Sequence, residues 1–224
     1  MKGESLYQHQ WFDGSQVDLP TGKVVCVGRN YAEHAQELNN PVPTEPLLFM
    51  KPASSIVSLE QPVVVKADFG SVHYETEIAV LIGKKLAGAP EGEVAAGISG
   101  VGIALDLTLR ELQSTLKEKG HPWEKAKGFD GSCPLSAFVP AECIVDWQDV
   151  PVQLHINGKL RQSGNSSQML NGILPLIAYI STFFTLEPGD VVITGTPAGV
   201  GQLEPGMQLK AALPGLLDVS TEIV

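Results

Sequence analysis

The chain has 224 residues, of which 43% are hydrophobic, and this length and composition fit one globular domain with a substantial core. Its formal net charge of −10 argues against a nucleic-acid partner, because binding to phosphates depends on clustered lysine and arginine. The three cysteines form no Cys-x-x-Cys pair, and no leader peptide or bilayer-length apolar stretch is visible, so we expect a cytoplasmic protein without a membrane partner.

Apolar and β-branched runs, broken often by glycine and proline, predict short strands that outnumber the helices. In chain order we predict a strand at Val24–Val27, a helix at Tyr31–Leu38, strands at Leu47–Met50, Val63–Val65, Tyr74–Ile82 and Val101–Leu107, a helix between Thr108 and Gly120, a strand at Val152–Ile156, a helix at Ser167–Phe184, and strands at Val191–Thr194 and Met207–Ala211. No repeat or linker divides them, which favours a single unit.

Local signals set the ends of the later helices. Thr108 and Glu111 are expected to form a capping box at the start of the middle helix, and Gly120 is placed to end it. Pro175 is expected to kink the last helix, because a proline inside a helix removes a backbone hydrogen bond. The apolar stripe of the middle helix consists of Leu109, Leu112 and Leu116.

Three acidic residues predict a metal site. Side chains alternate along a strand, so Glu75 and Glu77 point to the same side, with their Cα atoms roughly 6.5–7 Å apart. Neighbouring carboxylates in a β-rich core are costly unless a cation neutralises them, and Asp106, at the end of an apolar strand, is the natural third ligand. Three carboxylates suit Mg²⁺, Mn²⁺ or Ca²⁺ rather than zinc. The alternative is a solvated Glu-x-Glu pair that bridges to Lys84 or Lys85, with the aspartate as a helix cap.

Further motifs accompany these residues, and together they carry a family resemblance. The motifs are VGRNYAEH at 27–34, FMKP at 49–52, KAKGFD at 125–130 and ITGTPAGVG at 193–201. With His73-x-Glu75-x-Glu77 and Asp106, they closely resemble the fumarylacetoacetate hydrolase family, in particular its short acylpyruvate hydrolase and oxaloacetate decarboxylase branch. The resemblance runs from about Val24 to the C-terminus. Tyr74, Thr76 and Ile78 depart from the family pattern, which concerns the packing of the pocket more than the ligands.

The resemblance implies a fold, an assembly and an ion. The fold would be α+β and mainly β, a mixed β-roll or β-sandwich around the site with a few covering helices. An N-terminal arm at 1–22 would precede the family core at 23–224 in a single catalytic domain, and homodimers are usual in the family. The ion would be Mg²⁺ or Mn²⁺, bound by Glu75, Glu77 and Asp106.

The family's mobile catalytic segment, Asn-Tyr-x-x-His-x-x-Glu, is matched by Asn30, Tyr31, His34 and Glu37. His34 and Glu37 share a helix face, so the carboxylate can orient the imidazole and the pair can deprotonate water. The other catalytic candidates are Gln113 and Lys127, and the substrate-binding candidates are Arg29, Tyr31, Lys51, Arg110, Thr194 and Thr196. Without the resemblance, an ordinary solvated surface explains these charged residues about as well.

These assignments predict a hydrolase that cleaves the carbon–carbon bond of small 2,4-dioxo acids, the acylpyruvates. Attack of water at the distal carbonyl would release a carboxylic acid and the enolate of pyruvate, whose charge the dication would stabilise. The same enolate arises when oxaloacetate loses carbon dioxide, and related enols arise in the isomerisation of unsaturated 2-oxo diacids, so an oxaloacetate decarboxylase or an isomerase is the alternative. A non-catalytic binding module with a structural ion is an alternative of another class.

Overall fold

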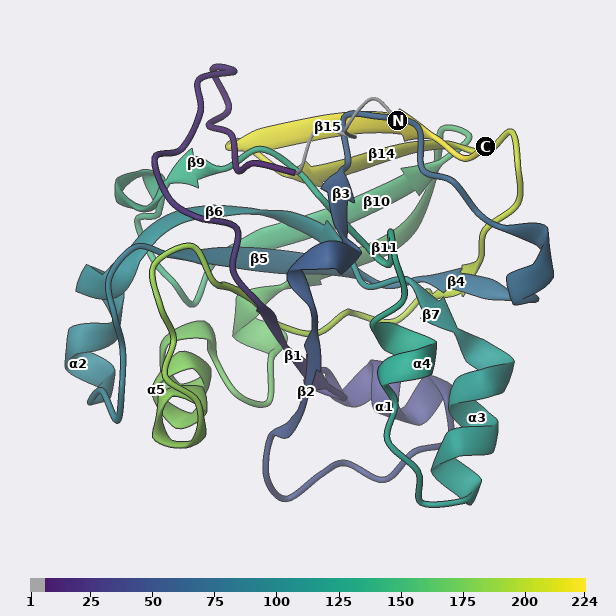
Figure 1. The fold of residues 1–224 in the computed structure, drawn as a ribbon, viewed down its shortest axis with the longest axis horizontal. Coiled ribbons are helices and arrows are strands. Elements are labelled where there is room, and N and C mark those ends of the chain that lie inside the picture. Colours follow the sequence, from purple (N-terminus) through teal and green to yellow (C-terminus); the bar gives the residue numbers. More distant parts are fainter. Residues whose placement is uncertain (1–6) are drawn as a thin grey trace.

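The strands of the computed structural model, which describes residues 7–224, form three sheets (Figure 1). The central mixed sheet has the order β2 (Leu47–Lys51), β1 (Val24–Gly28), β12 (Val191–Ile193), β5 (Thr76–Ile82), β6 (Ile98–Leu105), β8 (Cys133–Leu135) and β3 (Ile56–Ser58), with β9 (Val139–Pro140) also beside β6. The second sheet consists of β11 (Lys159–Asn165), β10 (Pro151–Ile156), β14 (Gln208–Leu213) and β15 (Leu217–Glu222). The third and smallest consists of β13 (Gly201–Gln202), β4 (Val72–Tyr74) and β7 (Thr108–Leu109).

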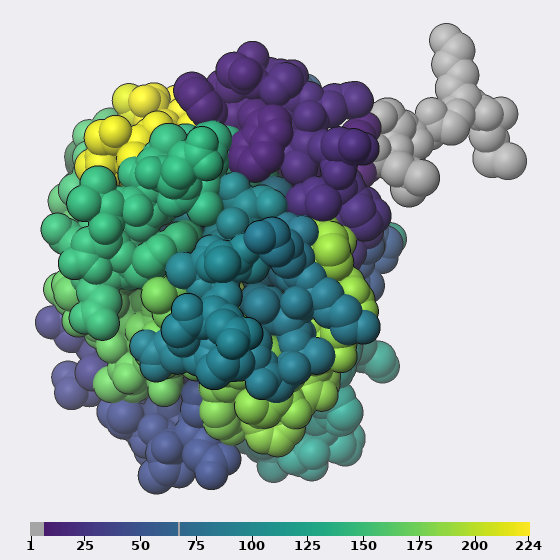
Figure 2. Space-filling model, turned by 90° about the vertical axis from the view of Figure 1, so that its left-hand side faces the viewer, coloured from purple at the N-terminus to yellow at the C-terminus, as the bar shows by residue number. Residues whose placement is uncertain are grey.

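The helices lie in two groups (Figure 1). The α-helices are α1 (Ala32–Glu37), α2 (Glu91–Val94), α3 (Arg110–Glu118), α4 (Glu124–Lys127) and α5 (Ile173–Phe183), and the short 3₁₀ turns are at Ala53–Ser55, Ala67–Phe69, Ala95–Gly97, Ala141–Cys143 and Ser166–Gln168. Figure 2 shows the end where α2 and α5 lie together, below the N-terminal arm. In the described residues no helix is long and apolar enough to cross a membrane.

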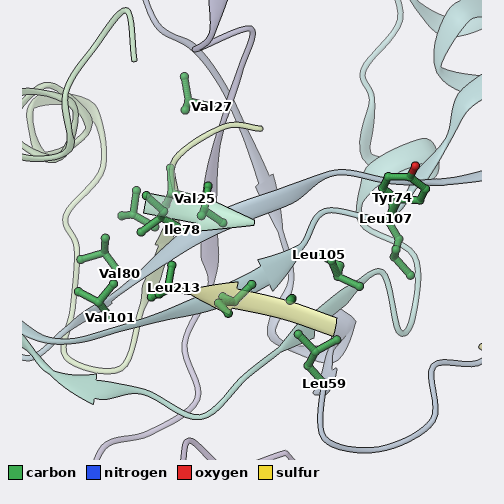
Figure 3. Packing of buried hydrophobic residues seen from close by; sticks show 14 of the residues in the cluster. Val25, Val27, Leu59, Tyr74, Ile78, Val80, Val101, Leu105, Leu107 and Leu213 are labelled. Carbon is green, nitrogen blue, oxygen red and sulfur yellow. The ribbon is translucent and has the colours of Figure 1, made fainter. Parts of the chain in front are cut away.

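The core has two sides because successive side chains of β5 and β6 point to opposite faces of the central sheet. Ile78, Val80 and Val101 point toward the second sheet and meet Leu213 of β14 (Figure 3). Residues of the opposite parity, such as Leu81, face a separate cluster that the N-terminal arm covers. The mainly β, α+β architecture is the one expected.

Two strand predictions need correction. The predicted strand at Val63–Val65 is wrong, because this segment has only a single bridge, from Val63 to Ile223, although its backbone N–H groups bond to the C-terminal residues. The predicted strand at Tyr74–Ile82 is interrupted at Glu75, where the chain leaves β4 and enters β5. Glu75, one of the predicted metal ligands, therefore lies between two strands and not within one.

Two helix predictions are also wrong. Thr108 does not cap α3, because β7 pairs with β4 and holds Thr108 in an extended conformation, and its hydroxyl donates to the carbonyl of Asp106 at 3.1 Å. Pro175 does not kink α5, since the helix begins at Ile173 and the proline lies in its first turn, where the N–H group has no helical partner to lose. Gly120 follows α3 with a φ of 63°, as predicted.

Candidate functional site

The pairing of β5 with β6 brings the three acidic residues together. In the antiparallel register Thr76 lies opposite Leu105, so Glu75 lies opposite Asp106, and the Asp106 N–H donates to the Glu75 carbonyl at 2.8 Å. Carboxylate oxygens of Glu75, Glu77 and Asp106 lie within 4.8 Å of one another, and all three residues are buried. The solvated alternative for the glutamate pair is therefore wrong.

Three buried or partly buried cations surround this acidic cluster. Lys127 Nζ lies 2.8 Å from Glu75 Oε2 and 2.6 Å from Asp106 Oδ2. Arg110 pairs with Glu75, and Lys51 Nζ lies 2.9 Å from Asp106 Oδ1. Three cations thus face three carboxyl groups.

The pKa values of the two glutamates are shifted in opposite directions. Burial raises the pKa of Glu75, but Lys127 and Arg110 outweigh it and hold that pKa well below its usual range. Burial, together with the charges of Asp106 and Glu75, raises the pKa of Glu77 well above its usual value. Burial opposes the charge of Lys127, yet Asp106 and Glu75 raise its pKa, so the ammonium stays protonated.

Glu77 is the member of the cluster that fits a metal ion best. Among the described residues it has no ion pair, and its Oε2 accepts one hydrogen bond, from Gly195 N at 2.6 Å. A buried carboxylate without its own cation, in a set of oxygen donors only, suits a hard divalent ion such as Mg²⁺ or Mn²⁺. The residues present therefore fit the implied ion.

The loop after β12 is tied to β5 by its threonines. The hydroxyl of Thr194 donates to Ile78 O at 3.1 Å, and that of Thr196 donates to Thr76 O at 2.9 Å. Gln162, buried in β11, donates to the Thr196 hydroxyl at 2.8 Å. The two threonine protons are therefore engaged with the strand, and the sequence contained no signal for Gln162, which stands in a polar run.

His34 and Glu37 of α1 form a pair beside this loop. His34 is buried, and its Nδ1 lies 3.2 Å from Glu37 Oε2, while Glu37 Oε1 accepts a hydrogen bond from Gly199 N at 3.0 Å. If Nδ1 carries the proton toward the carboxylate, Nε2 is free to accept another. The start of α1 is held by Asn30, whose Nδ2 donates to the carbonyls of Asn171 and Thr194, each at 2.9 Å.

The remaining predicted residues differ in access to the site. Arg110 Nη1 donates to Gln113 Oε1 at 2.9 Å, which leaves the amide nitrogen of buried Gln113 available. The hydroxyl of Tyr31 is buried without a partner among the described residues, and burial, with the charge of Glu77, raises its pKa. Arg29 is partly buried, with the carbonyl of Pro41 at 3.5 Å from Nη1.

Lys51 is enclosed rather than open to a ligand. It is 0% exposed, and besides its ion pair with Asp106 its ammonium donates to the carbonyl and hydroxyl of Ser132, at 3.0 and 3.1 Å. Lys51 therefore pairs with Asp106 inside the core of the protein.

Three hollows among the described residues lie away from the acidic cluster. One of about 710 Å³ lies between the N-terminal arm and β3, and another of about 760 Å³ lies on β14 and β15. A smaller one of about 450 Å³ borders Tyr74 and Gly199, next to the Glu37 contact. None of these three hollows is lined by the acidic cluster, so the site is identified by the chemistry of its residues.

Comparison with known proteins agrees with this geometry. The family model described as fumarylacetoacetate (FAA) hydrolase C-terminal matches residues 23–224. The chain belongs to the fumarylacetoacetate hydrolase family. This match and the fold confirm the predicted family, and with it an enzyme.

Relatives within the family carry several activities. The oxaloacetate tautomerase YcgM of Escherichia coli K12 is 52% identical over 211 residues, which are 94% of this chain and 96% of that protein. The mitochondrial oxaloacetate decarboxylase of Dictyostelium discoideum is 41% identical over 204 residues, 90% of this chain and 94% of that protein. The structure of Pseudomonas aeruginosa fumarylpyruvate hydrolase in complex with Mn²⁺ and pyruvate superposes with a TM-score of 0.91 at 34% identity, and covers 100% of this chain and 98% of that one.

Proposed function

We propose that this enzyme moves a proton on oxaloacetate, interconverting its keto and enol forms at the carbon between the 2-oxo group and the distal carboxylate. The observation that carries the proposal is His34, a buried imidazole that Glu37 orients through Nδ1 and that lies within electrostatic range of Glu75 in the acidic cluster. Keto–enol exchange needs a base that takes a proton from carbon and returns one, and an oriented imidazole suits that task. The 52% identity with an oxaloacetate tautomerase supports the same substrate.

The acidic cluster would hold Mg²⁺ or Mn²⁺ through Glu75, Glu77 and Asp106. When bound, such an ion supplies a Lewis acid that favours negative charge on the 2-oxo oxygen. Lys127, kept protonated by its acidic neighbours, adds positive charge from this chain, and Gln113 offers an amide N–H group that has no partner within residues 7–224.

Charge favours a dianionic substrate over a monoanionic one. The three carboxylates are matched by Lys51, Lys127 and Arg110, so a dication with all three acids ionised leaves a surplus of two positive charges. Oxaloacetate carries two carboxylates at neutral pH, whereas a simple acylpyruvate carries one. A dianion therefore offsets this surplus of positive charge better than a monoanion, and this favours oxaloacetate over the acylpyruvates expected first.

Hydrolysis of a carbon–carbon bond is the second candidate. It is favoured by the 34% identity with a fumarylpyruvate hydrolase, and by the ability of an imidazole–carboxylate pair to deprotonate water. Decarboxylation of oxaloacetate, the activity for which the Dictyostelium relative is named, needs no water and no base at carbon. The three reactions thus make different demands on His34.

The test measures all three reactions on one preparation with Mg²⁺ or Mn²⁺. Relaxation of enol to keto oxaloacetate is followed by ultraviolet absorbance, decarboxylation by pyruvate release, and hydrolysis by loss of acetylpyruvate absorbance. We expect the first to be fastest and His34→Ala to slow it by about 10²–10⁴-fold. Glu33→Ala, an exposed residue one position before the histidine on α1, is the matched control and should leave the rate unchanged. If acetylpyruvate is hydrolysed while oxaloacetate relaxes at its uncatalysed rate, the proposal is wrong.

A further inference from the structure

Two cations outside the acidic cluster converge on the turn that follows α1. Lys117 of α3 donates through Nζ to Asn40 Oδ1 at 2.8 Å, and Arg29 Nη1 lies 3.5 Å from the carbonyl oxygen of Pro41. Because Asn40 and Pro41 are consecutive, both cations reach the same few ångströms of chain from different elements. Within residues 7–224 neither has a carboxylate within 4.0 Å, so their partners are neutral oxygens.

One face of α3 connects this turn to the acidic cluster. Arg110, Gln113 and Lys117 stand at positions i, i+3 and i+7, which lie on one side of a helix. Arg110 pairs with Glu75 at the near end of that face, and Lys117 lies two turns farther along, roughly 10 Å by helix rise. Side chains point back toward the N-terminus of their helix, and the charges of Arg110 and Glu75 act on Lys117, so its ammonium lies within electrostatic range of a short ligand at the acidic cluster.

The charges of these groups act on one another. Burial lowers the pKa of Lys117, and the positive charges of Arg29 and Arg110 lower it further, whereas Glu75 acts in the opposite direction. Burial also lowers the pKa of Arg29. The cations thus share a partly enclosed space within electrostatic range of Glu75, and their repulsion is relieved when an anion lies between them.

The backbone of Arg29 is held in an unfavourable conformation. Its φ is 60°, a region that residues with a Cβ atom rarely occupy. The next residue, Asn30, is locked by hydrogen bonds to Asn171 and Thr194, and these keep the turn in place. Strain that persists beside a functional site is commonly retained because it aims a side chain.

We infer that Arg29 and Lys117 bind the second carboxylate of a 2-oxo diacid whose first carboxylate and 2-oxo group lie at the acidic cluster. The inference rests on the proposed function and deepens it by assigning substrate specificity to this cation pair. Hydrogen bonds from these cations to an ionised carboxylate are stronger than their present contacts with neutral amide and carbonyl oxygens, because both partners are then charged. The pair selects diacids over monoacids and does not take part in the proton transfer.

The experiment compares two ligands that differ only at the far end. Calorimetric titration in excess Mg²⁺ measures the binding of 2-oxoglutarate and of 2-oxopentanoate, in which a methyl group replaces the terminal carboxylate. We expect the wild-type protein to prefer the diacid. Lys117→Met should weaken 2-oxoglutarate roughly tenfold and leave 2-oxopentanoate within about twofold, since one charge-assisted hydrogen bond is lost. Lys117→Arg should restore most of the preference.

The matched control is Lys119→Met, an exposed lysine just after α3, which should change neither affinity. Thermal unfolding establishes that the variants are folded, and Arg29→Met repeats the test from the other side of the turn. Equal weakening of both ligands by Lys117→Met would assign that lysine to the structure of the turn and overturn the inference. No weakening of either ligand, or a wild-type protein without a preference, would also overturn it.

The inference and the proposed function fail in different ways. If oxaloacetate is not turned over but the diacid preference depends on Lys117, the proposed reaction is wrong and the subsite stands. If oxaloacetate is turned over and its KM is the same in Lys117→Met and Arg29→Met, the reaction stands and the subsite is wrong. Where both hold, the variants raise KM for oxaloacetate and leave kcat near that of the wild type.

Discussion

Glu75 and Glu77 stand two residues apart, yet the structure predicts that replacing each by glutamine has opposite effects on the metal-free protein. Glu77 is buried without a cation of its own, and its one hydrogen bond, from Gly195 N at 2.6 Å, can be kept by a glutamine oxygen. Glu77→Gln should therefore leave the free energy of unfolding unchanged or raise it. Glu75→Gln removes the partner of Arg110 and one partner of Lys127.

The destabilisation expected for Glu75→Gln depends on which partners Lys127 and Arg110 keep. Removal of one member of a buried ion pair costs about 3–5 kcal/mol. Lys127 keeps Asp106 at 2.6 Å, and Arg110 keeps Gln113, so we expect Glu75→Gln to cost about 3 kcal/mol, the lower end of that range. Denaturant unfolding in EDTA at pH 8 measures both variants against the wild type.

Added Mg²⁺ should separate both variants from the wild type. At a concentration of 100 times Kd, a ligand that binds only the folded state stabilises it by about 2.7 kcal/mol. For a chain of this size that is a rise of roughly 5–10 °C in Tm. Either glutamine variant should lose most of this rise, because each lacks one of the three carboxylates.

The pH dependence has a definite sign. The pKa of Glu77 is raised above its ordinary value of 4.5, so above that value the folded protein holds a proton that the unfolded chain releases. This contribution makes the metal-free wild type less stable as pH rises from about 4.5 toward the folded pKa, and Glu77→Gln removes it. If Glu77→Gln instead lowers stability in EDTA by several kcal/mol, or is stabilised by Mg²⁺ as much as the wild type, the charge assignment is wrong.

Two further predictions concern the loop that carries the Glu77 hydrogen bond. Gly195→Ala should weaken Mg²⁺ binding in calorimetry, because an added Cβ would lie 2.7 Å from Asn30 Cβ. The control is Gly206→Ala, where φ is similar but the space around the glycine is open. An equal loss of Mg²⁺ affinity in that control would assign the effect to backbone strain alone. Gln162→Leu should lower the free energy of unfolding in urea by about 2–3 kcal/mol, since Thr76 N and Pro197 O lose their hydrogen bonds to Gln162. Gln202 is exposed, so Gln202→Leu should change the free energy of unfolding little. Equal losses in the two variants would contradict the argument.

Strands whose apolar pattern is local could be predicted from the sequence, as for β1 and β10, which lie within a residue of the predicted ranges. Polar edge strands such as β11 were missed because their side chains face solvent and carry no apolar pattern. The cap at Thr108 failed for a different reason. Its local signal was present, but pairing of β7 with β4 used the same residue in a strand.

The sequence by itself determined the chemistry of this protein: three acids, an imidazole–carboxylate pair at helical spacing and the family motifs. The spacing of Glu75 and Glu77 predicts that they share one side, and their carboxylates do lie within 4.8 Å of each other, although the strand is interrupted at Glu75. Tertiary structure alone decided that Asp106 lies opposite Glu75, because the register of β5 with β6 depends on long-range packing. It also decided that Lys51 is enclosed while Lys117 faces the turn after α1, since the exposure of a lysine depends on what packs around it.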